Sequence, residues 1–206
     1  RGLRDEKGQG VLTGLTNISD IKAFEYHDGV KSPCDGELSY RGYNIKDLVT
    51  GSKGKRFVFE EGAYLLLFGE LPTDTQLMEF QGRLSDCMEL PTNFTRDVIM
   101  KAPTSDIMGS MTRSILTLGS YDKEKESLEI PNVLRQSMQL IAVFPMLAVY
   151  AYHAYCHYEK NESMYIHRPE KDLSIAENFL RLLRPDTKFT ELEARVLDIA
   201  LLLHSS

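Results

Sequence analysis

Apolar residues recur at helical spacing along most of the chain after its N-terminal quarter. The segment 60–68 is apolar on most sides, which predicts a buried helix that Gly69 ends. The segment 132–158 is also long and apolar, with Pro131 suited to its first turn and Pro145 expected to kink it. These runs predict a protein built mainly of helices.

Two other segments each show one apolar face. Over residues 105–120, a 3.6-residue period predicts a helix whose inward face carries Ile107, Met108, Met111, Ile115 and Leu118. In the last helix, we expect the inward stripe to consist of Leu192, Val196, Ile199, Ala200 and Leu203.

Polar residues mark where several helices begin. In a capping box, a hydroxyl and a later Glu or Gln satisfy free backbone N–H groups, and three pairs have this spacing: Thr73/Gln76, Ser174/Glu177 and Thr190/Glu193. The first box predicts a helix to about residue 90, and the second predicts one that ends before Pro185. Shorter helices are expected over 94–101 and, capped by Asn44, over 44–48.

Short alternating runs near the N-terminus predict the β-structure of the chain. Residues 21–26 and 37–41 indicate a small hairpin, with turn signals at Asp28-Gly29 and Asp35-Gly36 and with Pro33 in the loop. We therefore expect an all-α, multi-helical fold with a small N-terminal β-hairpin.

Composition narrows the functional classes. The chain has 206 residues, 42% of them hydrophobic, and a net charge of -6. An acidic balance disfavours nucleic-acid binding, which needs clustered Lys and Arg, but it leaves an anionic small ligand possible. The longest apolar run, 140–152, is broken by Pro145 and is shorter than the roughly 20 residues of a membrane span, so no membrane partner is expected. The polar, Gly-rich first ten residues do not resemble a signal peptide.

The cysteines indicate a reducing compartment. Cys34, Cys87 and Cys156 are odd in number and none forms a CxxC pair. We expect a reduced protein in the cytoplasm of a bacterium or in a comparable compartment.

Candidate chemistry in the body of the chain is sparse. His153 and His157 stand four residues apart beside Cys156, a spacing that can hold a metal, but no third ligand follows, and a surface or interface patch is the preferred interpretation. No metal site is therefore predicted. Arg41 can pair with a carboxylate of a ligand or another subunit, or form a structural salt bridge, which we favour.

The last helix runs directly into His204, Ser205 and Ser206. We expect His204 near the core, where it can bind an anionic substrate or donate to a backbone carbonyl; its position alone favours the second role. An apolar helix that leads into such residues is typical of the front part of an enzyme whose chemistry lies further on.

Four segments resemble the citrate synthase family, in the order of that family. Residues 36–48 (GELSYRGYNIKDL) are similar to its N-terminal signature, and residues 59–73 (FEEGAYLLLFGELPT) to the helix and stop that follow. Residues 174–180 (SIAENFL) and 189–204, which lead into an "L-H-x-x-H" motif, complete the resemblance.

This resemblance implies the helical enzyme that condenses oxaloacetate with acetyl-CoA to give citrate and CoA as a homodimer. It divides the chain into residues 1–58, an N-terminal segment with the hairpin, and residues 59–206, part of the large domain, with the C-terminal part and the small domain absent. His204 matches the first histidine of the motif, and Ser105 is similar to the serine of an "S-H-P-M" segment near the substrate, although Asp106-Ile107 replaces His-Pro.

The resemblance places the family's oxaloacetate-binding histidine just after residue 206 and its catalytic histidine, aspartate and arginines further on, so no catalytic residue is predicted and this segment alone is expected to be inactive. His204 and Ser105 are the predicted substrate-binding residues, and acetyl-CoA enters as a substrate without a further cofactor. Two alternatives stay open: part of a 2-methylcitrate synthase, or a non-catalytic all-α dimerisation module.

Overall fold

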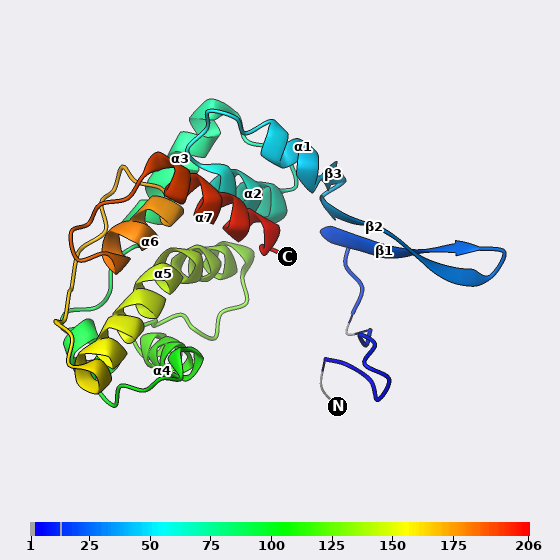
Figure 1. The fold of residues 1–206 in the computed structure, drawn as a ribbon. Coiled ribbons are helices and arrows are strands. Elements are labelled where there is room, and N and C mark those ends of the chain that lie inside the picture. The colour runs from blue at the N-terminus through cyan, green and yellow to red at the C-terminus, as the bar shows by residue number, and fades with distance from the viewer. Residues whose placement is uncertain (1–2, 13) are drawn as a thin grey trace.

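The computed structural model of the chain describes residues 3–12 and 14–206 as a helical body with one extended β-hairpin (Figure 1). Helices make up about half of the chain, and one antiparallel sheet has the strand order β1-β2-β3, so the expected fold class is confirmed. The elements are β1 (Ser19–His27), β2 (Val30–Tyr40), β3 (Tyr43–Asn44), α1 (Ile45–Thr50), α2 (Val58–Phe68), α3 (Asp74–Asp86), the π-helix η1 (Thr95–Ile99), α4 (Ile107–Gly119), α5 (Ile130–Lys160), α6 (Ile175–Leu183) and α7 (Glu191–Leu203).

The hairpin is longer than the sequence suggested. Its turn is Asp28-Gly29, whose φ angles of 51° and 80° are both positive, as a tight hairpin turn between His27 and Val30 requires. The second expected turn, at Asp35-Gly36, is wrong, because both residues lie inside β2. Strand β2 accommodates them in a bulge: Lys22 of β1 pairs with Glu37, but Phe24 pairs with Pro33, so the register shifts between these two pairs.

The polar residues expected to start helices do so. All three capping boxes are present, at the starts of α3, α6 and α7, with hydrogen bonds in both directions. Asn44 caps α1 by accepting from the backbone N–H of Lys46. Gly69 ends α2 with a φ of 83°, a left-handed conformation that suits glycine.

Two helix boundaries and one helix type differ from the expected ones. Helix α3 ends at Asp86, before the expected residue 90, and the next helical segment is the short π-helix η1. Helix α4 begins at Ile107 because the side chain of Asp106 accepts a hydrogen bond from the backbone N–H of Gly109, and Ser105 therefore lies outside the helix.

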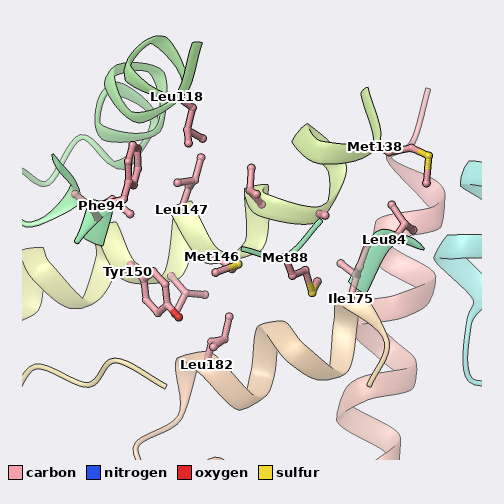
Figure 2. Packing of buried hydrophobic residues seen from close by; sticks show 14 of the residues in the cluster. Leu84, Met88, Phe94, Leu118, Met138, Met146, Leu147, Tyr150, Ile175 and Leu182 are labelled. Atoms are coloured by element: carbon pink, nitrogen blue, oxygen red, sulfur yellow. The ribbon is translucent and has the colours of Figure 1, made fainter. Parts of the chain in front are cut away.

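Helix α5 forms the centre of the body (Figure 2). Leu147 lies between Leu118 of α4 and Leu182 of α6, and these residues belong to one buried apolar cluster. With 31 residues, α5 is long and apolar enough to cross a membrane by length and composition alone. Since it packs against α4 and α6, it also fits the core helix of a globular protein, and the absence of a membrane partner stays a prediction.

Two predicted inward faces need correction. On α7, Leu192 and Val196 are 72% and 60% exposed, and Ala194, Asp198 and Leu202 are buried instead. On α4, Met108 is 73% exposed, while Ser110 and Ser114 lie inside with Leu118. Both errors have one cause: polar side chains that hydrogen-bond in the interior occupy positions that hydrophobicity assigns to the surface.

Candidate functional site

His204 follows the C-terminal end of α7 and is exposed, so the expectation that it lies near the core is wrong. Its Nδ1 atom lies 2.7 Å from the carbonyl oxygen of Ala200 in the same helix. A carbonyl oxygen only accepts, so Nδ1 carries the proton in this arrangement, as the backbone-bonded interpretation expected. The Nε2 atom of the ring has no hydrogen-bond partner in the described part of the chain.

Two more hydrogen bonds hold this helix end. The buried phenol of Tyr40 donates to the carbonyl oxygen of Leu202 at 2.7 Å, and the hydroxyl of Ser205 donates to Leu201 at 2.7 Å. These bonds satisfy carbonyl groups that a helix C-terminus otherwise leaves free. The end of β2 therefore fixes the turn that carries His204.

Helix α7 lies directly on α2. Gly62 leaves the space that the side chain of Leu202 fills, since a Cβ atom on Gly62 would be 2.3 Å from Leu202 Cδ1. One turn earlier, the carboxylate of Asp198 accepts from the backbone N–H groups of Val58 at 3.1 Å and of Phe59 at 2.9 Å. From Asp198 to Leu202 on α7, the contacting residues on α2 also move one turn toward its C-terminus, from Val58 and Phe59 to Gly62. The two helices therefore run side by side in the same direction.

A second buried carboxyl group lies at this junction. Glu60, on the first turn of α2, is 1% exposed, and its Oε1 accepts from the backbone N–H of Ile175, the first residue of α6, at 2.8 Å. Its Oε2 is buried and has no hydrogen-bond partner among residues 3–12 and 14–206. Asp198 and Glu60 thus bind the N-termini of α2 and α6, where the helix dipole favours negative charge.

Burial raises the pKa values of both groups. Loss of hydration, together with the nearby Asp198 carboxylate, raises the pKa of Glu60 to about 8, and the hydrogen bond from Ile175 opposes that rise. Loss of hydration also raises the pKa of Asp198, while its hydrogen bonds from Phe59 and Val58 oppose that rise. Sequence reasoning missed both residues; the available signal was an acidic residue inside an otherwise apolar run.

The larger cleft, of about 800 Å³, opens beside the first half of α7 and includes Asp198 in its wall. Both arginines in its wall already have partners: Arg56 pairs with Glu177 at 3.0 Å, and Arg195 donates to the carbonyl of Ser52 at 2.9 Å. His204 follows the opposite, C-terminal end of α7, and this helix end is the one beside the C label in Figure 1. This cleft therefore does not contain the predicted substrate residues.

A second cleft, of about 630 Å³, lies between the end of α3, η1 and α5. Met88, Phe94, Met146 and Tyr150 contribute apolar lining (Figure 2). The hydroxyl of Tyr150 donates to the carbonyl of His167, and burial raises its pKa to about 12. Neither His204 nor Ser105 lines this cleft.

Ser105 is exposed and precedes α4, where its carbonyl accepts from the N–H of Ile107 at 3.1 Å. Helix α4 packs on α5 and η1, whereas α7 packs on α2 and α6. No hydrogen bond joins Ser105 to His204 within the described part of the chain, and a substrate role for either residue stays a prediction.

The other candidates have local structural partners. His153 Nε2 lies 3.0 Å from the carbonyl of Leu182, and His157 Nδ1 lies 2.7 Å from that of Glu162. No cluster of three possible metal ligands occurs among residues 3–12 and 14–206. Each ring is thus directed to a different part of the backbone.

Arg41 also binds backbone. The favoured salt bridge is wrong, because no carboxylate pairs with Arg41 in the described ranges. Instead its guanidinium donates to the carbonyl of Leu66, near the end of α2, at 2.9 Å. Cationic groups are favourable at helix C-termini, so Arg41 still anchors the N-terminal segment.

Comparison with known proteins gives a consistent result. The family model described as "Citrate synthase, C-terminal domain" matches residues 6–206. The 2-methylcitrate synthase of Shewanella oneidensis is 31% identical over 169 residues, which are 82% of this chain and 41% of that protein. The citrate synthase of Saccharolobus solfataricus is 28% identical over 197 residues, 96% of this chain and 46% of that protein. The chain thus spans less than half the length of these relatives.

Solved structures resemble the fold over nearly the whole chain. The citrate synthase of Pyrobaculum aerophilum superposes with a TM-score of 0.75 at 25% identity, covering 99% of this chain and 49% of that one. A ternary complex of carboxymethyl coenzyme A and oxaloacetate with the citrate synthase of Thermoplasma acidophilum gives 0.74 at 21% identity, covering 94% and 45%. The second likeness concerns the fold alone.

Proposed function

The chain belongs to the citrate synthase family, and from that premise we propose that it forms the helical N-terminal portion of an enzyme that condenses acetyl-CoA with oxaloacetate to give citrate and CoA. The match to the family over residues 6–206 carries this proposal. By this proposal the parent enzyme is a transferase of the tricarboxylic acid cycle, and its substrates need no further cofactor.

Within this enzyme, we propose that His204 is a substrate-binding residue that contributes to the oxaloacetate site. Its Nδ1 is tied to Ala200, so the ring is held by its own helix while Nε2 stays accessible. When the ring is protonated, Nε2 also becomes a donor, and a cationic imidazole attracts the carboxylates of a dianion. Ser105 is a second, separate contact that the rest of the enzyme brings to the substrate.

The 206-residue chain alone is inactive by this proposal. Proton removal next to a thioester requires a placed base and a donor at the developing oxyanion. The ring nitrogens of four of the five histidines approach backbone carbonyls, and His27 approaches Glu25, so no histidine is paired with an aspartate within the described part of the chain.

Measuring the release of the CoA thiol tests both the inactivity of the 206-residue chain and the substrate role of His204. The 206-residue chain with acetyl-CoA and oxaloacetate should give no turnover, and a clear rate would contradict the proposal. In the full-length gene product that contains this chain, His204→Ala should raise KM for oxaloacetate about tenfold or more, which corresponds to about 1.4 kcal/mol of binding. His27→Ala, in the exposed hairpin, is the matched control and should leave KM unchanged.

The acyl donor is tested in the same assay, because relatives of both kinds resemble this chain. We propose acetyl-CoA as the donor; the alternative, 2-methylcitrate synthase activity, uses a propionyl group. One methylene in an apolar pocket changes the preference by only about 1–3 kcal/mol. A kcat/KM for propionyl-CoA above that for acetyl-CoA would select the alternative.

The second candidate function, a helical dimerisation module, rests on apolar side chains that α4 and α5 leave exposed: Met108, Leu116, Leu140, Phe144 and Tyr152. Such surface favours association. The two functions are compatible, and we propose a homodimer in both. The three free cysteines support a reducing compartment, which we propose is the bacterial cytoplasm.

A further inference from the structure

The last turn of α7 departs from α-helical hydrogen bonding. In an α-helix each backbone N–H donates to the carbonyl four residues earlier. Here the N–H of His204 donates to Leu201 at 3.2 Å, and that of Ser205 donates to Leu202 at 3.3 Å, so both bonds reach back only three residues. His204 itself has φ −109° and ψ 18°, outside the helical region. The helical pattern therefore ends at the residue that carries the imidazole.

Side chains occupy the carbonyls at this helix end. Three consecutive carbonyl oxygens each lie 2.7 Å from a side-chain donor: Ala200 from Nδ1 of His204, Leu201 from the hydroxyl of Ser205, and Leu202 from the phenol of Tyr40. A carbonyl oxygen has two lone pairs. Leu201 and Leu202 each accept one backbone N–H and one hydroxyl, so neither has a lone pair left for the donor that a continuing α-helix would use.

The phenol of Tyr40 differs from the other two donors because it comes from a distant part of the sequence, 162 positions away. Tyr40 is fully buried and pairs with Tyr43 across a tight turn, in which Arg41 and Gly42 have φ angles of 48° and 84°. The guanidinium of Arg41 donates to the carbonyl of Leu66 on α2 at 2.9 Å. The position of the phenol is thus set by the sheet and by α2, independently of the last turn of α7.

Loss of the phenol would let the hydrogen bonds of this turn change partners. Leu202 would have a free lone pair for the N–H of Ser206, which is the donor of a continuing α-helix. Each earlier N–H could then return to the carbonyl four residues back, and that of His204 would return to Ala200. The backbone would then compete with the imidazole for the Ala200 carbonyl. The phenol therefore acts on the ring by fixing which donors the carbonyls accept.

We propose that Tyr40 is a positioning residue for His204: its hydroxyl ends α7 before the histidine and leaves the Ala200 carbonyl to the ring. The proton is thereby held on Nδ1, and Nε2 is the nitrogen that can bind a substrate. This inference rests on the proposed substrate role of His204 only for its effect on KM. The hydrogen-bond arrangement is a property of the chain without substrate.

The test is histidine nitrogen NMR on the 206-residue chain at pH 8, where an ordinary histidine is neutral. The signal of His204 is the one that disappears in His204→Ala. We expect the wild-type ring to hold its proton on Nδ1. Tyr40→Phe removes the hydroxyl and keeps the aromatic ring, so the ratio of Nδ1–H to Nε2–H should fall about threefold or more, as expected for the loss of one hydrogen bond.

Ile45→Val is the matched control, because Ile45 belongs to the same buried apolar cluster as Tyr40. It removes one methylene, which lowers stability by an amount similar to the loss of a hydrogen bond, and it keeps the phenol. The ratio should stay at the wild-type value.

Three results would overturn the inference. The first is a wild-type ring with its proton on Nε2, which decides the matter whether or not the variants fold. The second is a ratio in Tyr40→Phe equal to that of wild type. The third is an equal fall in Ile45→Val, which would trace the change to a general loss of stability.

The full-length gene product that contains this chain gives a second measurement. Tyr40→Phe should raise KM for oxaloacetate about threefold or more, and Ile45→Val should leave it unchanged. In the His204→Ala background, Tyr40→Phe should have no further effect on KM, because the residue through which it acts is gone. A further rise of the same size there would show that Tyr40 does not act through His204.

Failure of the proposed function gives a different result. If His204→Ala leaves KM for oxaloacetate unchanged but the proton ratio responds to Tyr40→Phe, the substrate role is wrong and the positioning stands. If His204→Ala raises KM but the ratio does not respond, the substrate role stands and the positioning is wrong.

Discussion

The phenol of Tyr40 donates a 2.7 Å hydrogen bond to the carbonyl of Leu202, joining the end of the hairpin to the end of the last helix across 162 positions in the sequence. Tyr40 is fully buried, and it shares a small apolar cluster with Leu202, Val58 and Leu65. This bond closes the N-terminal segment onto the helix that carries His204.

Tyr40→Phe should lower the free energy of unfolding by about 0.5–1.5 kcal/mol, because it removes the hydrogen bond from the phenol and leaves the Leu202 carbonyl only the longer contact from the backbone N–H of Ser205, at 3.3 Å. Urea unfolding measures the change. Tyr26→Phe, at an exposed position in β1, is the matched control and should have no effect. Equal stability of the Tyr40→Phe chain and wild type would show that the bond is replaced by water.

Gly62→Ala tests the close approach of α2 and α7. The new methyl group would meet Leu202 Cδ1 at 2.3 Å, so one helix must move or the leucine must change rotamer. Overpacking of this kind costs about 1–3 kcal/mol, and it outweighs the helix propensity that alanine gains over glycine, at most about 1 kcal/mol. We expect a net loss of stability in thermal or urea unfolding.

Gly82→Ala is the matched substitution on α3, where a Cβ atom would meet nothing within 4 Å. It should raise stability by up to about 1 kcal/mol. In the Gly62→Ala background, Leu202→Ala removes the clash and should cost less than it does in wild type. If the costs of Gly62→Ala and Leu202→Ala were simply additive, the new methyl group would not clash with Leu202.

How much the sequence predicts depends on how local each interaction is. The capping boxes and the Asp28-Gly29 turn join residues at most three positions apart, and all of them form as expected. The face of α7 is set by Asp198, whose partners Val58 and Phe59 lie 140 and 139 positions away. A pattern within one helix carries no information about such a partner, so hydrophobicity assigned the exposed Leu192 and Val196 to the interior.

The candidate site follows the same rule. Family resemblance identified His204, and its position at the helix end made a backbone hydrogen bond the favoured interpretation. Its exposure was not predictable, because burial depends on what packs around the helix end. Glu60 and Asp198 are ordinary acidic residues in the sequence, and their unusual chemistry arises only where three helices meet.

Glu60→Gln should make the stability of the chain less dependent on pH. The pKa of this group is about 8 in the folded chain and near its ordinary value of 4.5 when unfolded. Between these values the unfolded chain releases the proton and the folded chain keeps it, so this group destabilises the fold progressively from pH 4.5 to about pH 8. Below pH 4.5 this group does not affect the stability, because both states keep the proton. Above about pH 8 both states have lost it, so the destabilisation no longer changes with pH.

The stability of Glu60→Gln relative to wild type should therefore grow from pH 5 to pH 8, by on the order of a few kcal/mol, and then level off. Urea unfolding at pH 5, 6.5 and 8 measures it. Glu61→Gln should run parallel to wild type over this range. A constant difference between the Glu60→Gln chain and wild type would mean that Glu60 is ionised in the fold.

Association through α4 and α5 is tested by a single charge. The two helices pack on each other and leave Met108 73%, Leu116 74% and Phe144 42% exposed, although apolar side chains of this size gain from burial. We expect size-exclusion chromatography with light scattering to find a dimer for wild type. Phe144→Asp should raise the dimer dissociation constant at least tenfold, because a carboxylate in an apolar contact loses its hydration without a partner. Ile21→Asp, at an exposed site in β1, is the control and should stay dimeric.

A monomeric wild-type chain at micromolar concentration would exclude this face as a sufficient interface, whereas a Phe144→Asp chain that stays dimeric would place the interface on other helices.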